Sequence, residues 1–278
     1  MNHISFAFFG TPEFSANILQ VLKQHALLPT IVVTAPDKKV GRKQVITYSA
    51  VKQWALENNI KVIQPHNPSE IASILNEKNI NLNIVAAYGY ILKKDILDIP
   101  QYGTLNVHTS LLPKYRGASP IESALKAGDE ITGSTIMLMD EKMDHGPIIT
   151  QEILPIQADD DQYTLFEKLS IHGGTLLAST IVPWVSGEIS PKEQDHDKAS
   201  YCYKIEKSDG NISNDTDIEK IRKYKAFKRW PGVFFFDNGK RIKVTEAECT
   251  EMKFNIISVI PEGKNEMSYQ QYLQNKST

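Results

Sequence analysis

Short apolar runs alternate with helical segments from residue 4 to residue 185, and few folds accommodate this order. We assign the apolar runs to buried strands because they are short and bounded by turn residues. The strands span 4–9, 30–34, 60–63, 82–87, 105–108, 135–139 and 148–156, and helices are predicted over 14–22, 48–58, 69–76, 120–127 and 163–185. This order predicts an α/β fold with a doubly wound, mostly parallel sheet, which binds ligands at the carboxyl ends of its strands.

Two helix starts carry residues that commonly cap helices. Thr11 is predicted to be an N-cap, with Pro12 at the first helical position. The run Ser119-Pro120-Ile121-Glu122 matches a capping box, in which the serine and the glutamate bond each other's backbone amides. Gly128 is expected to end that helix, because glycine readily adopts the left-handed conformation found there.

The pattern changes after residue 186. Residues 187–206 are polar and lack periodicity, which is typical of a linker. Short β-like runs follow at 232–236, 241–244 and 254–259, separated by turns such as Asp237-Asn238-Gly239. We therefore expect a large domain over residues 1–188, a linker over 189–206 and a small β-rich domain over 207–278.

Composition narrows the class of protein. The formal net charge is −2, so any binding to nucleic acid must use a local basic patch. The two cysteines, Cys202 and Cys249, are far apart and support neither a disulfide framework nor a zinc site. The N-terminal residues lack a basic leader with a cleavage site, and no apolar run approaches 18 residues. These features together predict a cytoplasmic protein that does not interact with membranes.

The run Asn106-Val107-His108-Thr109-Ser110-Leu111-Leu112-Pro113-Lys114-Tyr115-Arg116-Gly117 is the strongest candidate for a site. Side chains at i, i+2 and i+4 of a strand share one face, so Asn106, His108 and Ser110 are expected to point the same way. The two leucines and the proline would form an apolar lip, and Lys114, Arg116 and Gly117 a cationic loop. An amide, an imidazole and a hydroxyl beside an apolar lip suit carbonyl chemistry next to a flat ligand.

Asp144 lies in a second candidate segment, Met139–Ile148, and precedes a strand. A carboxylate near His108 would orient its ring and make it a better acid or base. Asp144 could instead be a turn residue whose side chain accepts a local hydrogen bond. Asn106 and His108 could likewise be buried residues with satisfied hydrogen bonds, but all these structural roles at once explain the pattern less well.

Two basic segments are candidates for contacts with a phosphate backbone. The first, residues 37–44, directly follows a strand and contains Lys38, Arg42 and Lys43. The second precedes Trp230 and consists of Lys220, Arg222, Lys223, Lys225, Lys228 and Arg229. Either segment could also be a solvated charged surface. The chain lacks the glycine-rich loops of dinucleotide and nucleoside triphosphate sites, the HExxH and GxSxG motifs and metal-ligand spacings, so we expect chemistry without a metal and without a covalent serine or cysteine.

These motifs resemble the methionyl-tRNA formyltransferases, which belong to the 10-formyltetrahydrofolate-dependent formyltransferases. The resemblance covers nearly the whole chain and rests on the run from Asn106 to Ala118 together with these segments: Phe9–Phe14, Ala35–Lys38, Gly41-Arg42, Val85–Leu92, Asp144-His145-Gly146, Tyr203–Ile205, Asp209-Gly210, Ala226-Phe227, Trp230–Gly232, Ile242–Val244, Pro261–Lys264 and Met267-Ser268.

The resemblance implies transfer of a formyl group from 10-formyltetrahydrofolate to the α-amine of methionine on initiator tRNA, by a monomeric enzyme without a metal. It implies catalytic roles for Asn106, His108 and Asp144. It further implies a folate site formed by Val85, Ala87, Tyr88, Gly89, Leu92, Ser110, Leu111, Leu112 and Pro113. The implied tRNA contacts are Lys38, Arg42, Lys43 and Arg229, with the small C-terminal domain as a tRNA-binding, β-barrel-like module.

Two departures from the family pattern leave alternatives open. Asp144 is followed by His145-Gly146-Pro147, which is closer to the glycinamide ribonucleotide and sugar formyltransferases, and the C-terminal domain is shortened between Cys249 and Phe254. An N-formyltransferase acting on an amino sugar nucleotide is therefore the main alternative. A hydrolase that releases formate from the same folate and a non-catalytic RNA-binding protein are two further alternatives.

Overall fold

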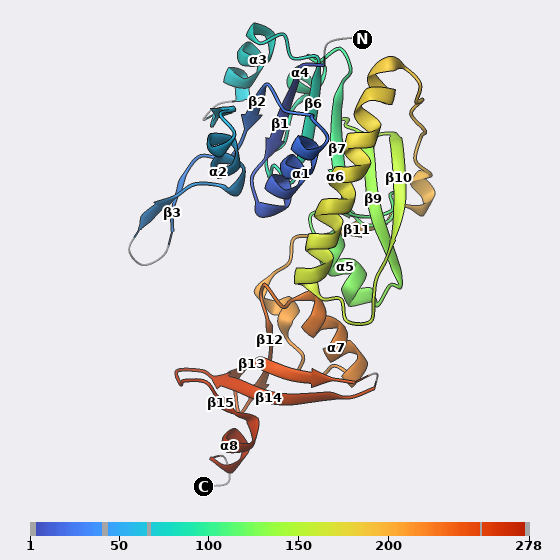
Figure 1. The fold of residues 1–278 in the computed structure, drawn as a ribbon. Helices are drawn as coiled ribbons and strands as arrows, with labels where there is room; N and C mark the ends of the chain where they lie inside the picture. Colours follow the sequence, from blue (N-terminus) through green and yellow to red (C-terminus); the bar gives the residue numbers. More distant parts are fainter. Residues whose placement is uncertain (1–3, 41–43, 66–67, 251, 276–278) are drawn as a thin grey trace. The chain divides into compact units, whose positions relative to one another are not determined.

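The computed structural model describes residues 4–40, 44–65, 68–250 and 252–275 (Figure 1). The chain separates into two compact units. Unit 1 comprises Met1–Gly117, Ile131–Pro155 and Phe166–Tyr201, and unit 2 comprises Ala118–Glu130, Ile156–Leu165 and Cys202–Thr278.

Unit 1 contains a seven-stranded sheet in the order β10-β9-β7-β6-β1-β2-β5. The central strands β7, β6, β1, β2 and β5 are parallel, and β9 pairs antiparallel with both β7 and β10. This arrangement confirms the predicted α/β fold with a mostly parallel sheet. The strands are β1 (Phe6–Gly10), β2 (Ile31–Val33), β5 (Lys61–Ile63), β6 (Leu82–Ala86), β7 (Thr104–His108), β9 (Ile131–Leu138) and β10 (Ile148–Pro155).

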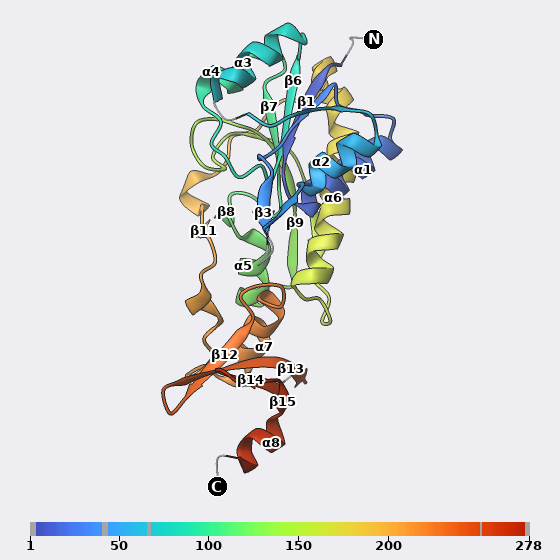
Figure 2. The same ribbon diagram turned by 90° about the vertical axis from the view of Figure 1, so that its left-hand side faces the viewer.

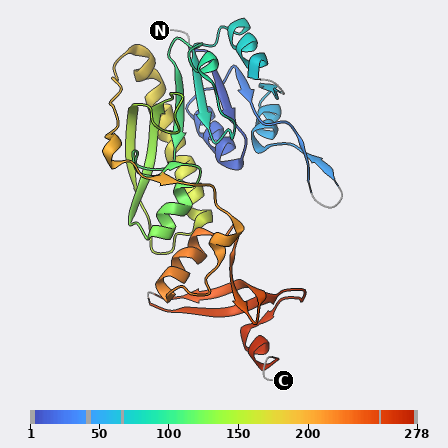
Figure 3. The same ribbon diagram turned by 180° about the vertical axis from the view of Figure 1, so that it is seen from behind.

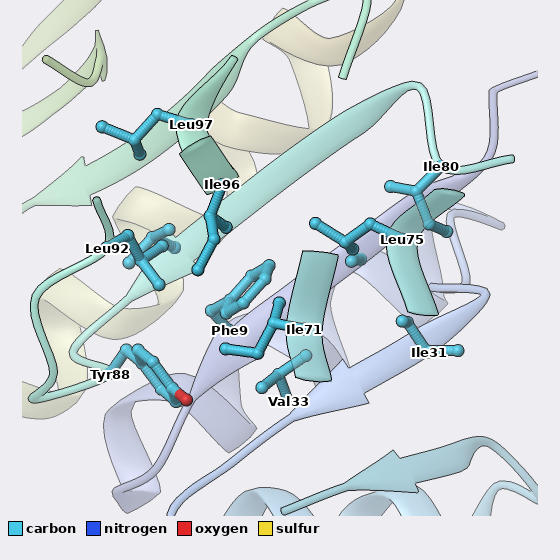
Figure 4. Close-up of a cluster of buried hydrophobic side chains, with 12 residues drawn as sticks. Phe9, Ile31, Val33, Ile71, Leu75, Ile80, Tyr88, Leu92, Ile96 and Leu97 are labelled. Atoms are coloured by element: carbon cyan, nitrogen blue, oxygen red, sulfur yellow. The ribbon is translucent and has the colours of Figure 1, made fainter. Parts of the chain in front are cut away.

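Helices cover both faces of this sheet because its central strands β1, β2, β6 and β7 are buried on both sides. Figure 2 shows α1 (Glu13–Gln24), α2 (Ala50–Glu57) and α6 (Gln162–Ser186) on one face, and α3 (Pro68–Glu77) and α4 (Lys94–Leu97) on the other. Under α3 and α4, a buried cluster joins the sheet to the helices (Figure 4). The labelled side chains of that cluster are Phe9, Ile31, Val33, Ile71, Leu75, Ile80, Tyr88, Leu92, Ile96 and Leu97.

Two adjacent glycines let α6 approach its neighbours closely. A Cβ on Gly173 would lie 2.9 Å from Val107 Cγ1, and a Cβ on Gly174 would lie 2.9 Å from Val21 Cβ. Val107 stands between Asn106 and His108 on β7, so α6 supports the strand that carries the candidate site.

The N-cap predicted at Thr11 is wrong, whereas Ser119 is an N-cap residue as predicted but does not form the predicted capping box. The N-cap of α1 is Pro12, and the hydroxyl of Thr11 donates instead to the carbonyl of Tyr88 at 3.1 Å. Ser119 precedes α5 (Pro120–Ala127), but its side chain makes no capping hydrogen bond, because its ψ of 53° departs from the extended conformation of a serine cap. Gly128 does end α5, with a left-handed φ of 73°.

The basic segment at residues 37–44 contributes one strand of an antiparallel pair. The strands of this pair are β3 (Lys38–Val40) and β4 (Val45–Thr47). Lys38 is exposed on β3. Arg42 and Lys43 lie outside the described residues.

The segment after α6 belongs to unit 1 as far as Tyr201 (Figure 3). It runs beside β10, where Lys192 and Ile148 exchange two backbone hydrogen bonds of 2.8 Å. The segment continues through a 3₁₀ turn (His196–Lys198) into β11 (Tyr201–Cys202), which pairs with β8 (Arg116–Gly117).

Unit 2 contains a four-stranded antiparallel sheet in the order β12-β13-β14-β15. The turn at Asn238 and Gly239 has φ values of 47° and 77°, so the predicted hairpin is confirmed. The strands are β12 (Val233–Asp237), β13 (Lys240–Cys249), β14 (Phe254–Pro261) and β15 (Met267–Ser268). The helices of this unit include α5, α7 (Asp217–Ala226) and α8 (Tyr269–Gln274), and a 3₁₀ turn (Lys207–Gly210) comes before α7. A small β-rich C-terminal part is thus confirmed, and its strand order is open over the residues described.

Candidate active site

An amide, an imidazole and a carboxylate meet at the carboxyl end of β7. Asn106 Nδ2 donates to Asp144 Oδ1 at 3.3 Å, and His108 Nδ1 lies 3.6 Å from Asp144 Oδ2. Asn106 and His108 are nearly buried, whereas 16% of the Asp144 side chain is exposed. The structure therefore brings together the three residues that the sequence singled out, and leaves the carboxylate within reach of solvent.

The second ring nitrogen of His108 fixes the tautomer. His108 Nε2 lies 2.8 Å from the carbonyl oxygen of Tyr115, and a carbonyl can only accept, so Nε2 carries a proton. In the neutral ring Nδ1 is then the nitrogen without a hydrogen, and it lies 3.6 Å from the carboxylate of Asp144. An imidazolium at this position would pair with Asp144 directly.

Asp144 is held by its side chain and by its backbone. The amide N–H of Gly117 donates to Asp144 Oδ2 at 2.8 Å. The residue has a left-handed φ of 49°, a conformation that costs energy for a residue other than glycine and often occurs at functional sites. Two residues later, Gly146 packs against β9 so closely that a Cβ would lie 2.0 Å from the carbonyl oxygen of Leu138.

Sequence reasoning missed the role of two residues that support this turn, Gln194 and Arg116. Gln194 Nε2 donates to the carbonyl oxygens of Asp144 and Gly146 at 2.9 and 2.7 Å. Arg116 was expected in a cationic loop, but it is 1% exposed and bonds to Gln194 and His196. Its place next to the Asn106–His108 segment was a usable signal, whereas the polar segment around Gln194 offered none.

Ser110 lies beyond the strand, so the strand rule that placed it on the face of Asn106 and His108 does not apply to it. β7 ends at His108, and the Ser110 hydroxyl turns back to donate to the carbonyl of Lys114. The Ser110 carbonyl accepts from Thr135 Oγ1 at 2.6 Å. Ser110 therefore closes the turn that presents Leu111, Leu112 and Pro113, of which Leu112 is buried and the other two are partly exposed.

The candidate folate residues lie on the neighbouring strand and the loop that follows it. Val85 on β6 pairs with Asn106 on β7, and Ala87 follows the end of β6. The loop turns at Ala87 and Gly89, whose φ values are 47° and 83°. Tyr88 and Leu92 belong to the buried cluster of Figure 4, and burial raises the pKa of Tyr88 to about 12.

The outer part of this loop can accept a flat polar ligand. Ile91 is 85% exposed and Tyr90 53% exposed. Over the described part of the chain, the backbone amides of Gly89, Tyr90, Ile91 and Leu92 donate no hydrogen bond to the protein. Apolar side chains next to unused donors suit a pterin-like ring, which has an apolar face and a polar edge.

Of the candidate RNA contacts, Lys38 is in unit 1 and Arg229 in unit 2. Arg229 lines a cavity of about 150 Å³ together with Lys228, Lys243 and Tyr224. Its guanidinium lies 5.4 Å from the centre of the Tyr163 ring.

In the described ranges, no group of three or more histidine, cysteine or acidic residues is arranged to hold a metal. None of the described helices combines the length and apolarity needed to cross a membrane.

Solved structures share this fold at low sequence identity. A methionyl-tRNA formyltransferase from Clostridium thermocellum matches with a TM-score of 0.61 and 15% identity, over 96% of this chain and 100% of that one. The sugar 3N-formyl transferase WlaRD matches with a TM-score of 0.64 and 20% identity, over 95% and 100%. HypX from Aquifex aeolicus matches with a TM-score of 0.67 and 13% identity over 99% of this chain, which spans 48% of that longer protein.

Sequence comparisons are more specific. Residues 2–181 match the formyl transferase family, and residues 204–261 match the formyl transferase C-terminal domain. Methionyl-tRNA formyltransferase from Caldicellulosiruptor saccharolyticus is 44% identical over 88% of this chain and 80% of its own length. The enzyme of that name from Caldanaerobacter subterraneus subsp. tengcongensis is 36% identical over 96% and 95%. With such matches along most of its length, the chain belongs to the formyl transferase family, as one of the methionyl-tRNA formyltransferases.

Proposed function

We propose that this protein transfers the formyl group of 10-formyltetrahydrofolate to the α-amine of methionine on initiator tRNA. The observation that carries the proposal is the convergence of Asn106, His108 and Asp144 at the carboxyl end of β7. Ligands of doubly wound sheets bind at such strand ends. The curated relatives that are 36–44% identical carry this enzyme name, whereas the sugar formyltransferase WlaRD shares only the fold.

Asn106 is suited to stabilise the developing negative charge on the formyl oxygen. Its Nδ2 has two hydrogens, and one points toward Asp144 Oδ1. The other can be donated to the substrate oxygen. A preorganised donor of this kind in a water-poor site contributes on the order of 100-fold or more to turnover.

His108 and Asp144 are suited to handle protons. An imidazolium of His108, held by the carbonyl of Tyr115 and by Asp144, would place a positive charge beside the same oxygen. The partly exposed carboxylate of Asp144 would take the proton from the attacking amine through a water molecule. The bound folate supplies the formyl group: the amine adds to the formyl carbon, and collapse of the resulting oxyanion breaks the bond to the folate nitrogen, which takes up a proton as it leaves.

The loop after β6 is the proposed folate site. Val85, Ala87, Tyr88, Gly89 and Leu92 would hold the pterin edge through the backbone and the buried side of the loop. Leu111 and Pro113 would form the wall between folate and acceptor, positioned by Ser110 and Leu112. The unused amides of residues 89–92 support this assignment, because a pterin edge needs donors and acceptors at fixed positions.

The proposed RNA contacts are the hairpin of β3 and β4 and the C-terminal domain. Lys38 on the hairpin would contact tRNA phosphates together with Arg42 and Lys43, and Arg229 would do so from the domain over residues 207–278. The cations Lys228, Arg229 and Lys243 around one small cavity support the second contact. We also propose that the enzyme is a cytoplasmic monomer that acts in translation initiation.

The test is formyl transfer by purified protein with 10-formyltetrahydrofolate and three parallel acceptors: methionyl initiator tRNA, an amino sugar nucleotide and none. We expect formylated methionyl-tRNA at about 1 per second or faster, a usual enzyme turnover. Acceptor affinity should fall steeply with salt, because contacts with phosphates release counterions. Transfer to the sugar alone, or formate release without an acceptor, would contradict the proposal.

A further inference from the structure

The side-chain amide of Gln194 binds the turn that carries Asp144, and all of its polar atoms have hydrogen-bond partners. The side chain is 5% exposed. Its Nε2 uses both hydrogens on backbone carbonyls, those of Asp144 at 2.9 Å and Gly146 at 2.7 Å. These two bonds hold the backbone of the turn, while the side chain of Asp144 accepts a separate bond at Oδ2 from the Gly117 amide.

Arg116 determines which way the amide of Gln194 points. Arg116 Nε and Nη2 donate to Gln194 Oε1 at 3.1 and 2.7 Å, so the oxygen faces the guanidinium and the NH₂ group faces the turn. Arg116 Nη2 also lies 2.8 Å from His196 Nδ1, which must be the acceptor because arginine only donates. A buried guanidinium with several partners is rigid, and the amide it holds is rigid as well.

We propose that Gln194, oriented by Arg116, is a positioning residue for Asp144. The inference rests on the proposed role of Asp144 as proton acceptor. Asp144 has a left-handed φ of 49°, so its turn needs outside support to stay in one conformation. Gln194 supplies that support through the backbone, while the carboxylate stays directed at His108 and Asn106.

The chemical requirement is two donors at this position, which glutamine has and glutamate lacks. Gln194→Glu keeps the shape and the pairing with Arg116, but it places a carboxylate oxygen against the carbonyls of Asp144 and Gly146. The turn must then move to escape the repulsion. A displacement of the reacting group by roughly 1 Å is enough to cost about 100-fold in turnover.

The experiment compares Gln194→Glu with wild type in the formylation assay and in thermal unfolding. We expect turnover to fall by roughly 10- to 100-fold, with the KM for folate within about threefold. Thr180→Val is the control, because it removes a buried hydroxyl that donates to Leu176 within α6. If the two variants lose similar thermal stability and similar activity, the loss is a general effect of destabilisation and the proposal is overturned.

A double-mutant cycle then tests whether Gln194 acts through Asp144. In an Asp144→Asn background, Gln194→Glu should reduce the residual transfer by less than about threefold, since the group it positions is already disabled. A loss as large as that in the wild-type background would contradict the proposal.

A readout independent of activity separates this inference from the proposed function. The amide of Gly117 bonds to Asp144 Oδ2, so displacement of Asp144 should lower its protection from hydrogen exchange, measured by NMR, at least tenfold in Gln194→Glu and not in Thr180→Val. Unchanged protection at Gly117 overturns the inference even if the wild type is active. If the wild-type protein formylates no acceptor but Gln194→Glu still lowers the protection of the Gly117 amide, the positioning role is supported and the proposed function is refuted.

Discussion

Replacing Gly146 with alanine tests how tightly the turn at Asp144 is packed. A Cβ at this position would lie 2.0 Å from the carbonyl oxygen of Leu138 and 3.2 Å from its carbon. Carbon–oxygen contacts are normally about 3.3 Å or longer, so the turn or the strand end has to shift by roughly 1 Å. The strand end resists because Leu138 N donates to the carbonyl of Pro147 at 2.9 Å.

The displacement should reach Asp144, two residues earlier on the same turn. Overpacking of this kind destabilises a protein by about 1–3 kcal/mol. Misplacing a proton acceptor by about 1 Å lowers turnover by roughly 100-fold. We therefore expect Gly146→Ala to combine a moderate fall in melting temperature with a large fall in kcat for formyl transfer.

Gly187→Ala provides a control of matched chemistry. Gly187 follows α6 with a φ of 77°, and a Cβ there would meet nothing within 4 Å. An alanine in this left-handed conformation costs about 1–2 kcal/mol without disturbing a neighbour. The melting temperature of Gly187→Ala should fall by about as much as that of Gly146→Ala, while its kcat stays near that of wild type. A Gly146→Ala variant that keeps kcat within twofold of wild type would refute the packing argument.

Three further predictions concern other parts of unit 1. Asn106→Ala should lower kcat by roughly 100-fold or more with little change in folate affinity, since the amide acts on developing charge; a change in folate affinity alone, measured by fluorescence titration, would rule this role out. Burial lowers the pKa of His172 from 6.5, partly opposed by Glu152, so its contribution to stability is present above pH 6.5 and lost as pH falls. The free energy of unfolding in urea should therefore fall more between pH 7.5 and pH 5 for wild type than for His172→Gln. Equal losses would contradict this role of His172. Burial raises the pKa of Tyr88 from 10.0 to about 12, so the stability it contributes is lost as pH rises between these values. Wild type should lose more stability than Tyr88→Phe over this range in the same assay, and the same loss in both proteins would contradict the assignment.

The predicted fold follows from burial, which leaves a periodic record in the sequence. Apolar runs such as 82–87 mark strands covered on both faces, and the structure has β6 at Leu82–Ala86. The long helix predicted over 163–185 is α6, Gln162–Ser186. Capping failed at Thr11 and Ser119, because a cap depends on backbone angles and on competing partners, and Thr11 finds its partner 77 residues away at Tyr88.

The catalytic candidates could be found in the sequence because polar residues are unusual on a buried strand. Asn106 and His108 stand two residues apart on β7, and a strand places such residues on one face. The strand ended at His108, so the rule did not reach Ser110, whose hydroxyl bonds the carbonyl of Lys114. A sequence pattern can mark chemistry along one element but cannot show where that element stops.

By itself, then, the sequence determined the α/β sheet, the family and the pair on β7, because periodic burial and local motifs are properties of neighbouring residues. Only the tertiary structure decided how Asp144 is held. Arg116 resembles a surface cation in the sequence, yet its partners Gln194 and His196 lie 78 and 80 residues away and bury it. Gln194 in turn reaches carbonyls 48 and 50 residues away, and backbone carbonyls are the same in every residue. A contact between a side chain and a distant backbone leaves no pattern in the sequence, which is why the support of the site appears only in the fold.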